Sequence, residues 1–151
     1  ATYRKSFELP QSLAKRERLF LELGDLAEIA EVTLNGKQLG LVWLPPYRIE
    51  ISGAVQAGAN QLEVQIANLW ANRLIGDELQ APDVIWETKG KSGGIAPLST
   101  LPDWLLQGKP RPSAGRRAFS TWNYVQPKQK LLPSGLLGPV TLKHVDFNQQ
   151  P

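Results

Sequence analysis

Three short stretches combine aromatic side chains with polar ones in the manner that carbohydrate recognition requires. Trp and Tyr rings stack on the apolar C–H faces of sugars, while neighbouring Asn, Asp or Arg side chains fix the hydroxyls. The candidate carbohydrate-binding groups are Trp43 with Tyr47 and Arg48, Trp70 with Asn72, Arg73 and Asp77, and Trp122 with Asn123 and Tyr124. The competing explanation, which the burial preference of Trp favours, is that each Trp fills the core at one end of the fold.

Catalytic residues are only weakly indicated. Hydrolysis of a glycosidic bond ordinarily uses two carboxyl groups about 5 to 9.5 Å apart, but almost all carboxylates here fall on the polar phase of predicted strands. His144 is the single histidine, and there is no cysteine. A catalytic triad, a two-histidine metal site or a thiolate site is therefore not assembled from local residues. We predict no catalytic residue, and the metal content stays undetermined.

The elements that must position the aromatic groups are short strands. Asn35 and Gly36 separate two apolar strands, and both accept the positive φ angles of a type I′ hairpin turn. Ile49 and Val64 lie in stretches where apolar and polar residues alternate, which is typical of half-buried antiparallel strands. Strands are predicted near 3–9, 17–23, 32–35, 38–42, 47–52, 62–68, 73–76, 117–122 and 139–147. Residues 25–31 have a helix-forming composition, but we interpret them as a lead-in to a strand.

The alternation also predicts which residues form the core. These are Leu19, Leu21, Leu23, Val32, Leu34, Ile49, Ile51, Leu62, Val64 and Ile66. Regularly spaced short strands with such a core are typical of an all-β sandwich.

A long stretch at about 79–115, rich in Pro, Gly, Ser and Lys, interrupts this pattern. Loops of this length are usually functional or disordered. Its apolar residues, among them Trp86 and Trp104, argue against disorder because exposing them to water is costly. Residues 101–106 resemble a short helix with Pro102 in its first turn. We expect a lid or flap that packs on the sandwich.

Arg73 and Asp77 are four residues apart and would face the same side of a continuing strand. We interpret them as a buried bidentate ion pair that links the long loop to the sandwich. Such a pair sets geometry more reliably than stability, because desolvation can cancel the Coulomb gain. The alternative is that both side chains bind sugar hydroxyls.

Charge is unevenly distributed along the chain. Residues 1–87 hold 8 Lys and Arg against 12 Asp and Glu, whereas residues 88–151 hold 9 against 2. A basic surface for an acidic polysaccharide or nucleic acid is one explanation, and a solvated loop is the other. The basic residues are scattered, which favours the loop and argues against a nucleic-acid partner. No apolar run is long enough to span a membrane.

Four strings carry a family resemblance: VTLNGKQLG with WLPPYRIEIS, NLWANRLIGDE, RRAFSTWNY and LLPSGLLGPVTL. Because of these strings, the sequence resembles the galactose-binding-like domains of glycoside hydrolases. Within that class it resembles the sugar-binding domain of family 2 and, more closely, the C-terminal sandwich of family 106 α-L-rhamnosidases. The resemblance implies an all-β, galactose-binding-domain-like jelly-roll β-sandwich over 1–151, a single domain with one long, partly structured loop insertion at about 79–115.

The resemblance also has functional implications. It places catalysis in a separate barrel domain outside this chain, implies a secreted or periplasmic location in a bacterium, and implies no cofactor other than a structural calcium ion. About 6 to 8 oxygen ligands for calcium cannot be assembled from any local motif. From the resemblance, the expected partners are carbohydrate and the catalytic domain of a parent glycoside hydrolase.

Three functions of different classes stay open at this point. The first is a non-catalytic accessory domain of an α-L-rhamnosidase-like hydrolase, and the second is an autonomous carbohydrate-binding module for a plant or bacterial polysaccharide. The third is a stand-alone polysaccharide lyase using His144, Tyr124 and Arg116. A contiguous apolar patch would favour the accessory domain. Exposed coplanar Trp and Tyr rings would favour the binding module, and a cleft that joins His144, Tyr124 and Arg116 would favour the lyase.

Overall fold

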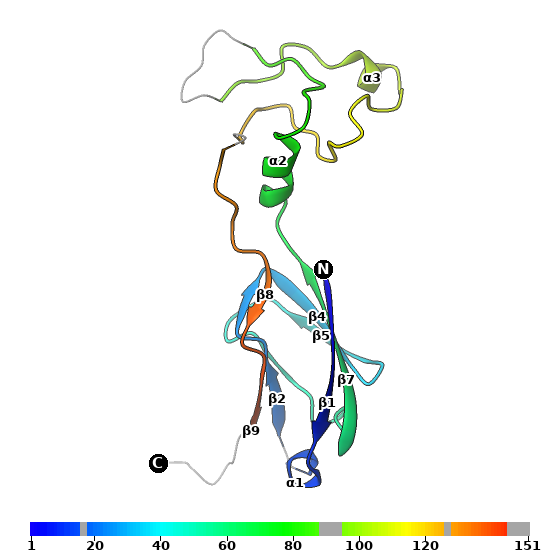
Figure 1. The fold of residues 1–151 in the computed structure, drawn as a ribbon, viewed down its shortest axis with the longest axis vertical. Coiled ribbons are helices and arrows are strands. Elements are labelled where there is room, and N and C mark those ends of the chain that lie inside the picture. The colour runs from blue at the N-terminus through cyan, green and yellow to red at the C-terminus, as the bar shows by residue number, and fades with distance from the viewer. Residues whose placement is uncertain (16–17, 88–94, 126–127, 145–151) are drawn as a thin grey trace. The chain divides into compact units, whose positions relative to one another are not determined.

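The computed structural model describes residues 1–15, 18–87, 95–125 and 128–144. The chain divides into two compact units (Figure 1). Residues 1–69 and 133–151 form the first, here called the sandwich unit, and residues 70–132 form the second, the inserted unit. The inserted unit is wider than the insertion expected at 79–115. Whether the chain is one folding domain stays a prediction, because compactness alone does not establish independent folding.

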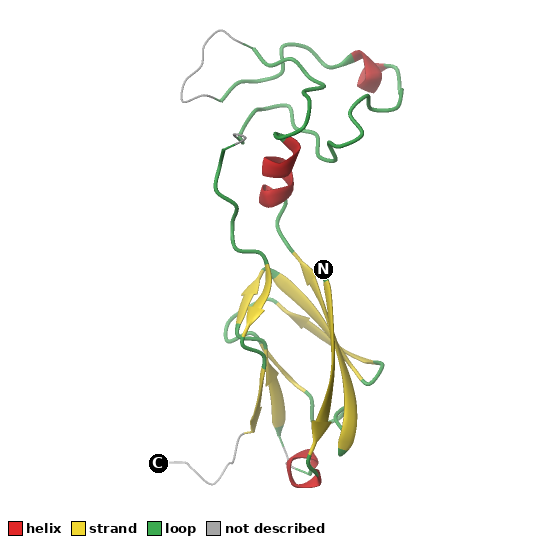
Figure 2. Cartoon of the chain, viewed as in Figure 1, coloured by secondary structure: helices red, strands yellow, loops and turns green. Residues whose placement is uncertain are grey.

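The sandwich unit consists of antiparallel sheets (Figure 2). The largest has the order β1 (Thr2–Leu9), β7 (Gly58–Ala67), β4 (Ile29–Leu34) and β5 (Lys37–Val42). A second has the order β6 (Arg48–Glu50), β2 (Leu19–Glu22) and β9 (Thr141–His144), and a third pairs β3 (Asp25–Ala27) with β8 (Gly135–Gly138). A short helix, α1 (Gln11–Ala14), follows β1. The all-β sandwich is confirmed.

The predicted hairpin is confirmed. Asn35 and Gly36 adopt φ angles of 52° and 78° between β4 and β5. The Asn35 side chain also holds the tip in place, since its Nδ2 donates to the carbonyl of Ala54 at 2.9 Å and its Oδ1 accepts from the amide of Gln61 at 2.8 Å. A hairpin turn thus doubles as an anchor for the neighbouring loop.

The core prediction is confirmed for all of its residues but one. Ile49 is half-buried, because β6 is an edge strand, and it packs against the core cluster. The core cluster of the sandwich unit contains four further buried residues that the sequence pattern did not single out: Leu9, Leu26, Ala30 and Val42. Residues 25–31 form strand rather than helix, as expected, since they contribute β3 and the start of β4.

Several predicted strands differ in their bounds. The strand expected at 139–147 corresponds to β9 alone, and β8, which ends just before it, is a strand that the sequence pattern did not predict. Residues 145–147 lie outside the described residues, as does Glu17 at the start of the strand expected at 17–23. The strand expected at 47–52 shrinks to β6. Such differences at element ends are common because terminal hydrogen bonds are the weakest.

Two strands predicted in the inserted unit are wrong. Residues 73–76 belong to helix α2 (Ala71–Asp77), which the i,i+4 pair of Arg73 and Asp77 stabilises. Residues 117–122 form no strand, because the amides of Arg117 and Ala118 donate to the Asp77 carboxylate instead of to a neighbouring strand. The short helix expected at 101–106 is confirmed as α3 (Asp103–Leu106), which starts directly after Pro102.

Candidate functional site

The inserted unit is organised around the buried carboxylate of Asp77, at the end of α2. This residue is 2% exposed and accepts hydrogen bonds from the amides of Arg117 at 2.9 Å and Ala118 at 2.6 Å, in addition to pairing with Arg73. Burial acts to raise the pKa of Asp77, but the two amide donors and the Arg73 guanidinium outweigh it, so the pKa lies below its ordinary value. A charged carboxylate therefore holds the segment at 117–118 against α2.

Arg116 supplies a second anchor. It is 7% exposed, and its guanidinium donates to Glu78 Oε1 at 3.0 Å and to the carbonyls of Gln80 at 3.3 Å and Ala81 at 3.0 Å. A buried guanidinium needs such complete pairing, because an unpaired charge away from water is costly. Arg116 is thus committed to the fold of the inserted unit and is not free to bind a ligand.

Arg111 and Asp83 form a further ion pair in the inserted unit, and we call these residues together with Asp77 and Arg116 the frame. The Nε of Arg111 donates to Asp83 Oδ2 at 2.5 Å, its Nη2 to Asp83 Oδ1 at 3.2 Å, and its Nη1 to the carbonyl of Ala118 at 2.6 Å. The guanidinium also lies 5.4 Å from the ring centroid of Trp104, which in turn contacts Phe119 edge-on. Because two guanidinium nitrogens of Arg111 contact the two carboxylate oxygens of Asp83, the pairing fixes the relative orientation of the two side chains as well as their distance.

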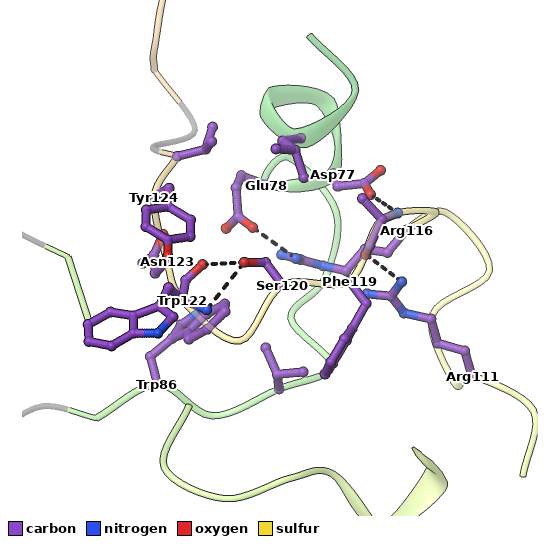
Figure 3. Close-up of a pocket in the computed structure, with 14 residues that line it drawn as sticks. Asp77, Glu78, Trp86, Arg111, Arg116, Phe119, Ser120, Trp122, Asn123 and Tyr124 are labelled. Atoms are coloured by element: carbon purple, nitrogen blue, oxygen red, sulfur yellow. Dashed lines mark hydrogen bonds and ion pairs between the residues drawn. The ribbon is translucent and has the colours of Figure 1, made fainter. Parts of the chain in front are cut away.

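A cavity of about 40 Å³ lies within this frame, with Trp122, Asn123 and Tyr124 on one side and Arg111 on the opposite side (Figure 3). That volume accommodates about one water molecule. Ligand pockets that enclose a small molecule usually measure about 300 Å³ or more. The cavity is therefore too small to enclose a sugar ring.

An exposed aromatic surface is formed by Trp122 and Tyr124. Their ring centroids lie 6.4 Å apart with an interplanar angle of 28°, and the residues are 44% and 60% exposed. The backbone beneath them is fixed: the amide of Trp122 donates to Ser120 Oγ at 3.2 Å, and the amide of Asn123 donates to the carbonyl of Ala96 at 2.8 Å. Two nearly parallel, exposed rings on a fixed backbone can stack against the apolar face of a sugar.

Asn123 lies between these two aromatic residues in sequence. Its Oδ1 is the one buried side-chain oxygen or nitrogen without a hydrogen-bond partner in the part of the chain that the structure describes. Leaving such an acceptor unpaired costs about 1 to 3 kcal/mol. Asn123 lines the cavity beside Trp122 and Tyr124, so a water molecule or a ligand hydroxyl there would satisfy it.

The group of Trp43, Tyr47 and Arg48 does not form a comparable surface. Trp43 is exposed, but Tyr47 packs against the core of the sandwich unit. The Arg48 guanidinium lies 5.1 Å from the ring centroid of Phe20, a cation–π contact that occupies it.

The group at Trp70 is also largely structural. The Asn72 side chain donates to the carbonyl of Leu132 at 2.8 Å and accepts from the Leu132 amide at 2.8 Å, while Arg73 and Asp77 pair with each other. Trp70 itself is exposed. The expectation that Trp43, Trp70 and Trp122 fill the core is wrong for all three, since each keeps a substantial part of its surface in contact with solvent.

The Arg73 and Asp77 pair forms, but differently from the prediction. One nitrogen of Arg73 contacts one oxygen of Asp77, so the pair is not bidentate, and the Arg73 side chain is half-exposed. The same nitrogen donates to the carbonyl of Gly115 at 2.8 Å. The pair therefore links α2 to another segment of the inserted unit. Arg73 and Asp77 meet because residues four apart lie on the same side of a helix, and not because they share one face of a strand.

No metal-binding cluster is found in the described part of the chain. Arg116 and Tyr124 line the cavity of the inserted unit, whereas His144 belongs to β9 of the sandwich unit. Within residues 1–15, 18–87, 95–125 and 128–144, no group of three His, Cys, Asp or Glu side chains is arranged to hold a metal ion. No helix among these residues has the length and apolarity needed to cross a membrane.

Sequence reasoning missed the part of the frame formed by Asp83, Arg111 and Arg116, which holds the segment at Ala118. The uneven charge distribution was the available signal, because acids at 77–87 precede the basic stretch that pairs with them. The distribution of charge along the sequence does not identify which Arg side chain pairs with which Asp or Glu side chain.

Comparison with known proteins gives a consistent result. Residues 1–104 match the sequence model of a family described as glycosyl hydrolase 2 galactose-binding domain-like. The chain is 44% identical over 143 residues to a protein of Formosa agariphila provisionally named as a beta-glucuronidase, an alignment that covers 94% of this chain and 12% of that protein. The structure resembles a solved rhamnosidase from Novosphingobium sp. PP1Y with a TM-score of 0.58 and 29% identity, covering 93% of this chain and 10% of that one. The chain therefore spans about a tenth of the length of these relatives.

Proposed function

Since the chain belongs to the glycosyl hydrolase 2 galactose-binding domain-like family, we propose that it is a non-catalytic accessory domain of a longer glycoside hydrolase and contacts carbohydrate through Trp122 and Tyr124. The observation that carries the sugar contact is the exposed, nearly parallel arrangement of these two rings. The accessory role is supported by the small share of each relative that the chain covers.

Exposed apolar side chains also support the accessory role. Large hydrophobic residues of the inserted unit that are exposed to solvent in the isolated chain include Leu79, Ile85, Leu101, Leu106 and Leu131. Exposed apolar side chains that gather into one patch mark a surface that a partner covers. A neighbouring domain of the same protein is the simplest cover, and a catalytic domain is the partner that the resemblance implies.

For the parent enzyme we propose an α-L-rhamnosidase-like hydrolase, secreted or periplasmic. The solved rhamnosidase covers nearly the whole chain and supports this choice. The Formosa agariphila relative supports a beta-glucuronidase as the competing parent. Release of rhamnose or of glucuronic acid by the complete parent protein distinguishes the two.

An autonomous carbohydrate-binding module is the second candidate, and the same pair of rings favours it. The two roles differ in what the parent adds: a binding module reaches its full affinity for polysaccharide alone, whereas an accessory domain binds weakly alone and gains affinity from its neighbour. The lyase candidate loses support, since Arg116 is fully engaged in structural contacts.

The decisive experiment compares the wild-type chain with the double variant Trp122→Ala/Tyr124→Ala in titrations against neutral and acidic oligosaccharides. We expect a wild-type Kd between about 1 μM and 1 mM, because an open aromatic surface gains little beyond stacking. The double variant loses binding with a nearly unchanged Tm, since both residues are exposed. Trp70→Ala, which removes another exposed aromatic of the inserted unit, retains binding and is the matched control.

Two results would contradict the proposal. Unfolding of the double variant would make Trp122 and Tyr124 structural residues. Sugar release by the purified chain, at a rate proportional to its concentration, would make it an enzyme.

A further inference from the structure

One face of β1 is incompletely covered: Tyr3 and Lys5 are exposed and Phe7 is half-buried. Tyr3, Lys5, Phe7 and Leu9 alternate along this strand and therefore point to the same side. Leu9 is 3% exposed and belongs to the core, which identifies that side as the interior of the sandwich. Tyr3 is nevertheless 39% exposed, and Lys5 is exposed as well.

The neighbouring strand β7 does not share this exposure. Lys5 lies directly opposite Leu62 in the β1–β7 pairing, and Tyr3 lies opposite Val64. Residues opposite each other in an antiparallel pair occupy the same face, yet Leu62 and Val64 are both buried. The interior is therefore covered up to β7 and open at β1, the edge of the largest sheet.

A cavity of about 500 Å³ lies where this cover is missing, and we call it the β1 groove. Its lining includes Tyr3 and Phe7 of β1, Leu21 of β2, Leu62 and Val64 of β7, and Leu142 of β9. β9 is an edge strand of the second sheet, just as β1 is of the first. The groove is thus bordered by two strand edges that have no further strand beside them in the described part of the chain.

We infer that the β1 groove receives one extended segment of the longer protein, which lies beside β9 and covers Tyr3, Lys5 and Phe7. This inference rests on the proposed membership of a longer hydrolase. The relatives supply ample polypeptide for it, since the chain covers only 12% and 10% of their lengths. Addition of a strand beside β9 extends the second sheet across the β1 groove and so buries the apolar row.

The groove also dictates the chemistry of the incoming segment. Its lining is mostly apolar, so alternate side chains of the segment have to be apolar. Lys5 makes no ion pair with any residue that the structure describes, and covering its ammonium without a partner would be costly. The segment therefore carries an Asp or Glu that faces Lys5. A strand with alternating apolar residues and one inward carboxylate is the occupant.

The test uses single thiols, because the chain contains no cysteine of its own. Lys5→Cys places a thiol in the groove, and Ser6→Cys places one on the opposite, exposed face of the same strand. Alkylation rates are measured by peptide mass spectrometry for both variants, in the 151-residue chain and in the complete protein encoded by the gene. Circular dichroism verifies that each variant is folded.

We expect alkylation of Lys5→Cys to be roughly tenfold or more slower in the complete protein than in the 151-residue chain, because reaction then requires local opening. Ser6→Cys should react equally in both. Equal rates for Lys5→Cys would overturn the inference, as would a gene that encodes these 151 residues alone. Slowing that depends on the concentration of the 151-residue chain would also overturn it, by identifying a second copy as the occupant. None of these variants touches Trp122 or Tyr124, so a failure here is separate from a failure of sugar binding.

Discussion

The side-chain amide of Asn35, at the tip of the β4–β5 hairpin, donates a 2.8 Å hydrogen bond to Oδ1 of Asn60, which is 1% exposed. Asn60 uses the rest of its hydrogen-bonding capacity within its own loop, accepting from the amide of Gln56 and donating to the carbonyls of Gln56 and Gly58. A buried amide with every group paired connects the hairpin tip to the loop before β7.

Replacing Asn60 is therefore expected to be costly. Asn60→Ala leaves the amide and carbonyl of Gln56 without their partner, and we expect the free energy of unfolding to fall by about 3 kcal/mol. Urea denaturation measures the change. Gln65→Ala, on the exposed face of the same strand, should stay within about 0.5 kcal/mol. Equal effects of the two substitutions would contradict this account of Asn60.

Gly24 and Gly36 provide a matched pair with φ angles of +66° and +78°. Alanine at either position incurs the left-handed backbone penalty of about 1 kcal/mol. Only at Gly24 would the new Cβ also collide with backbone, since it would lie 2.6 Å from the carbonyl oxygens of Gly138 and Pro139. Gly36→Ala should lower stability by about 1 kcal/mol, whereas Gly24→Ala should cost several times more or prevent folding. Comparable melting temperatures for the two variants would show that the backbone at Gly24 can shift.

Core substitutions test the strand phase. Val64 is almost completely buried and Ile49 is half-buried. Val64→Ala should cost about 2 to 3 kcal/mol, and Ile49→Ala about 1 to 2 kcal/mol despite its larger side chain, because cost follows the area removed from water and the cavity left behind. Denaturant titration gives both values. The reverse order would mean that the interior of the second sheet is assigned incorrectly.

Asp77 predicts a dependence of stability on pH. Its pKa in the folded state lies below the ordinary value of 3.8, so the unfolded chain binds this proton first as the pH falls. The stabilisation is present above about pH 4 and is lost as the pH falls through the lower folded-state pKa. Asp77→Asn should cost about 2 kcal/mol at pH 7, and the difference from wild type should shrink in acid.

The corresponding measurement is urea unfolding at neutral pH and at several values below pH 4. Asp103→Asn, an exposed carboxylate of the same unit, should change little at any pH. A difference between Asp77→Asn and wild type that persists unchanged at about pH 2 would show that shape, not charge, is responsible.

Most of the sandwich could be predicted because its signals are local. The turn at Asn35 and the alternation around Val64 depend on neighbouring residues, so strand identity and core phase follow from short windows of sequence. Ile49 was misjudged because burial also depends on a strand's place in its sheet, and β6 lies at an edge.

The inserted unit could not be predicted in the same way. Its order comes from contacts between residues far apart in sequence, such as Asp77 with Ala118 and Asp83 with Arg111. No periodicity identifies such pairs. Proximity in sequence grouped Trp122 with Tyr124 correctly, but their exposure depends on the backbone bond from Asn123 to Ala96, which is equally non-local.

The chain leaves the sandwich unit and returns to it at one place. Oδ1 of Asn68, just before the inserted unit, accepts a 3.0 Å hydrogen bond from the amide of Gly135, just after it. A turn of a few residues can span such a distance. In evolutionary terms, two recombination points would suffice to remove the inserted unit or exchange it for another, so that the exposed aromatic surface could change while the sandwich is inherited intact.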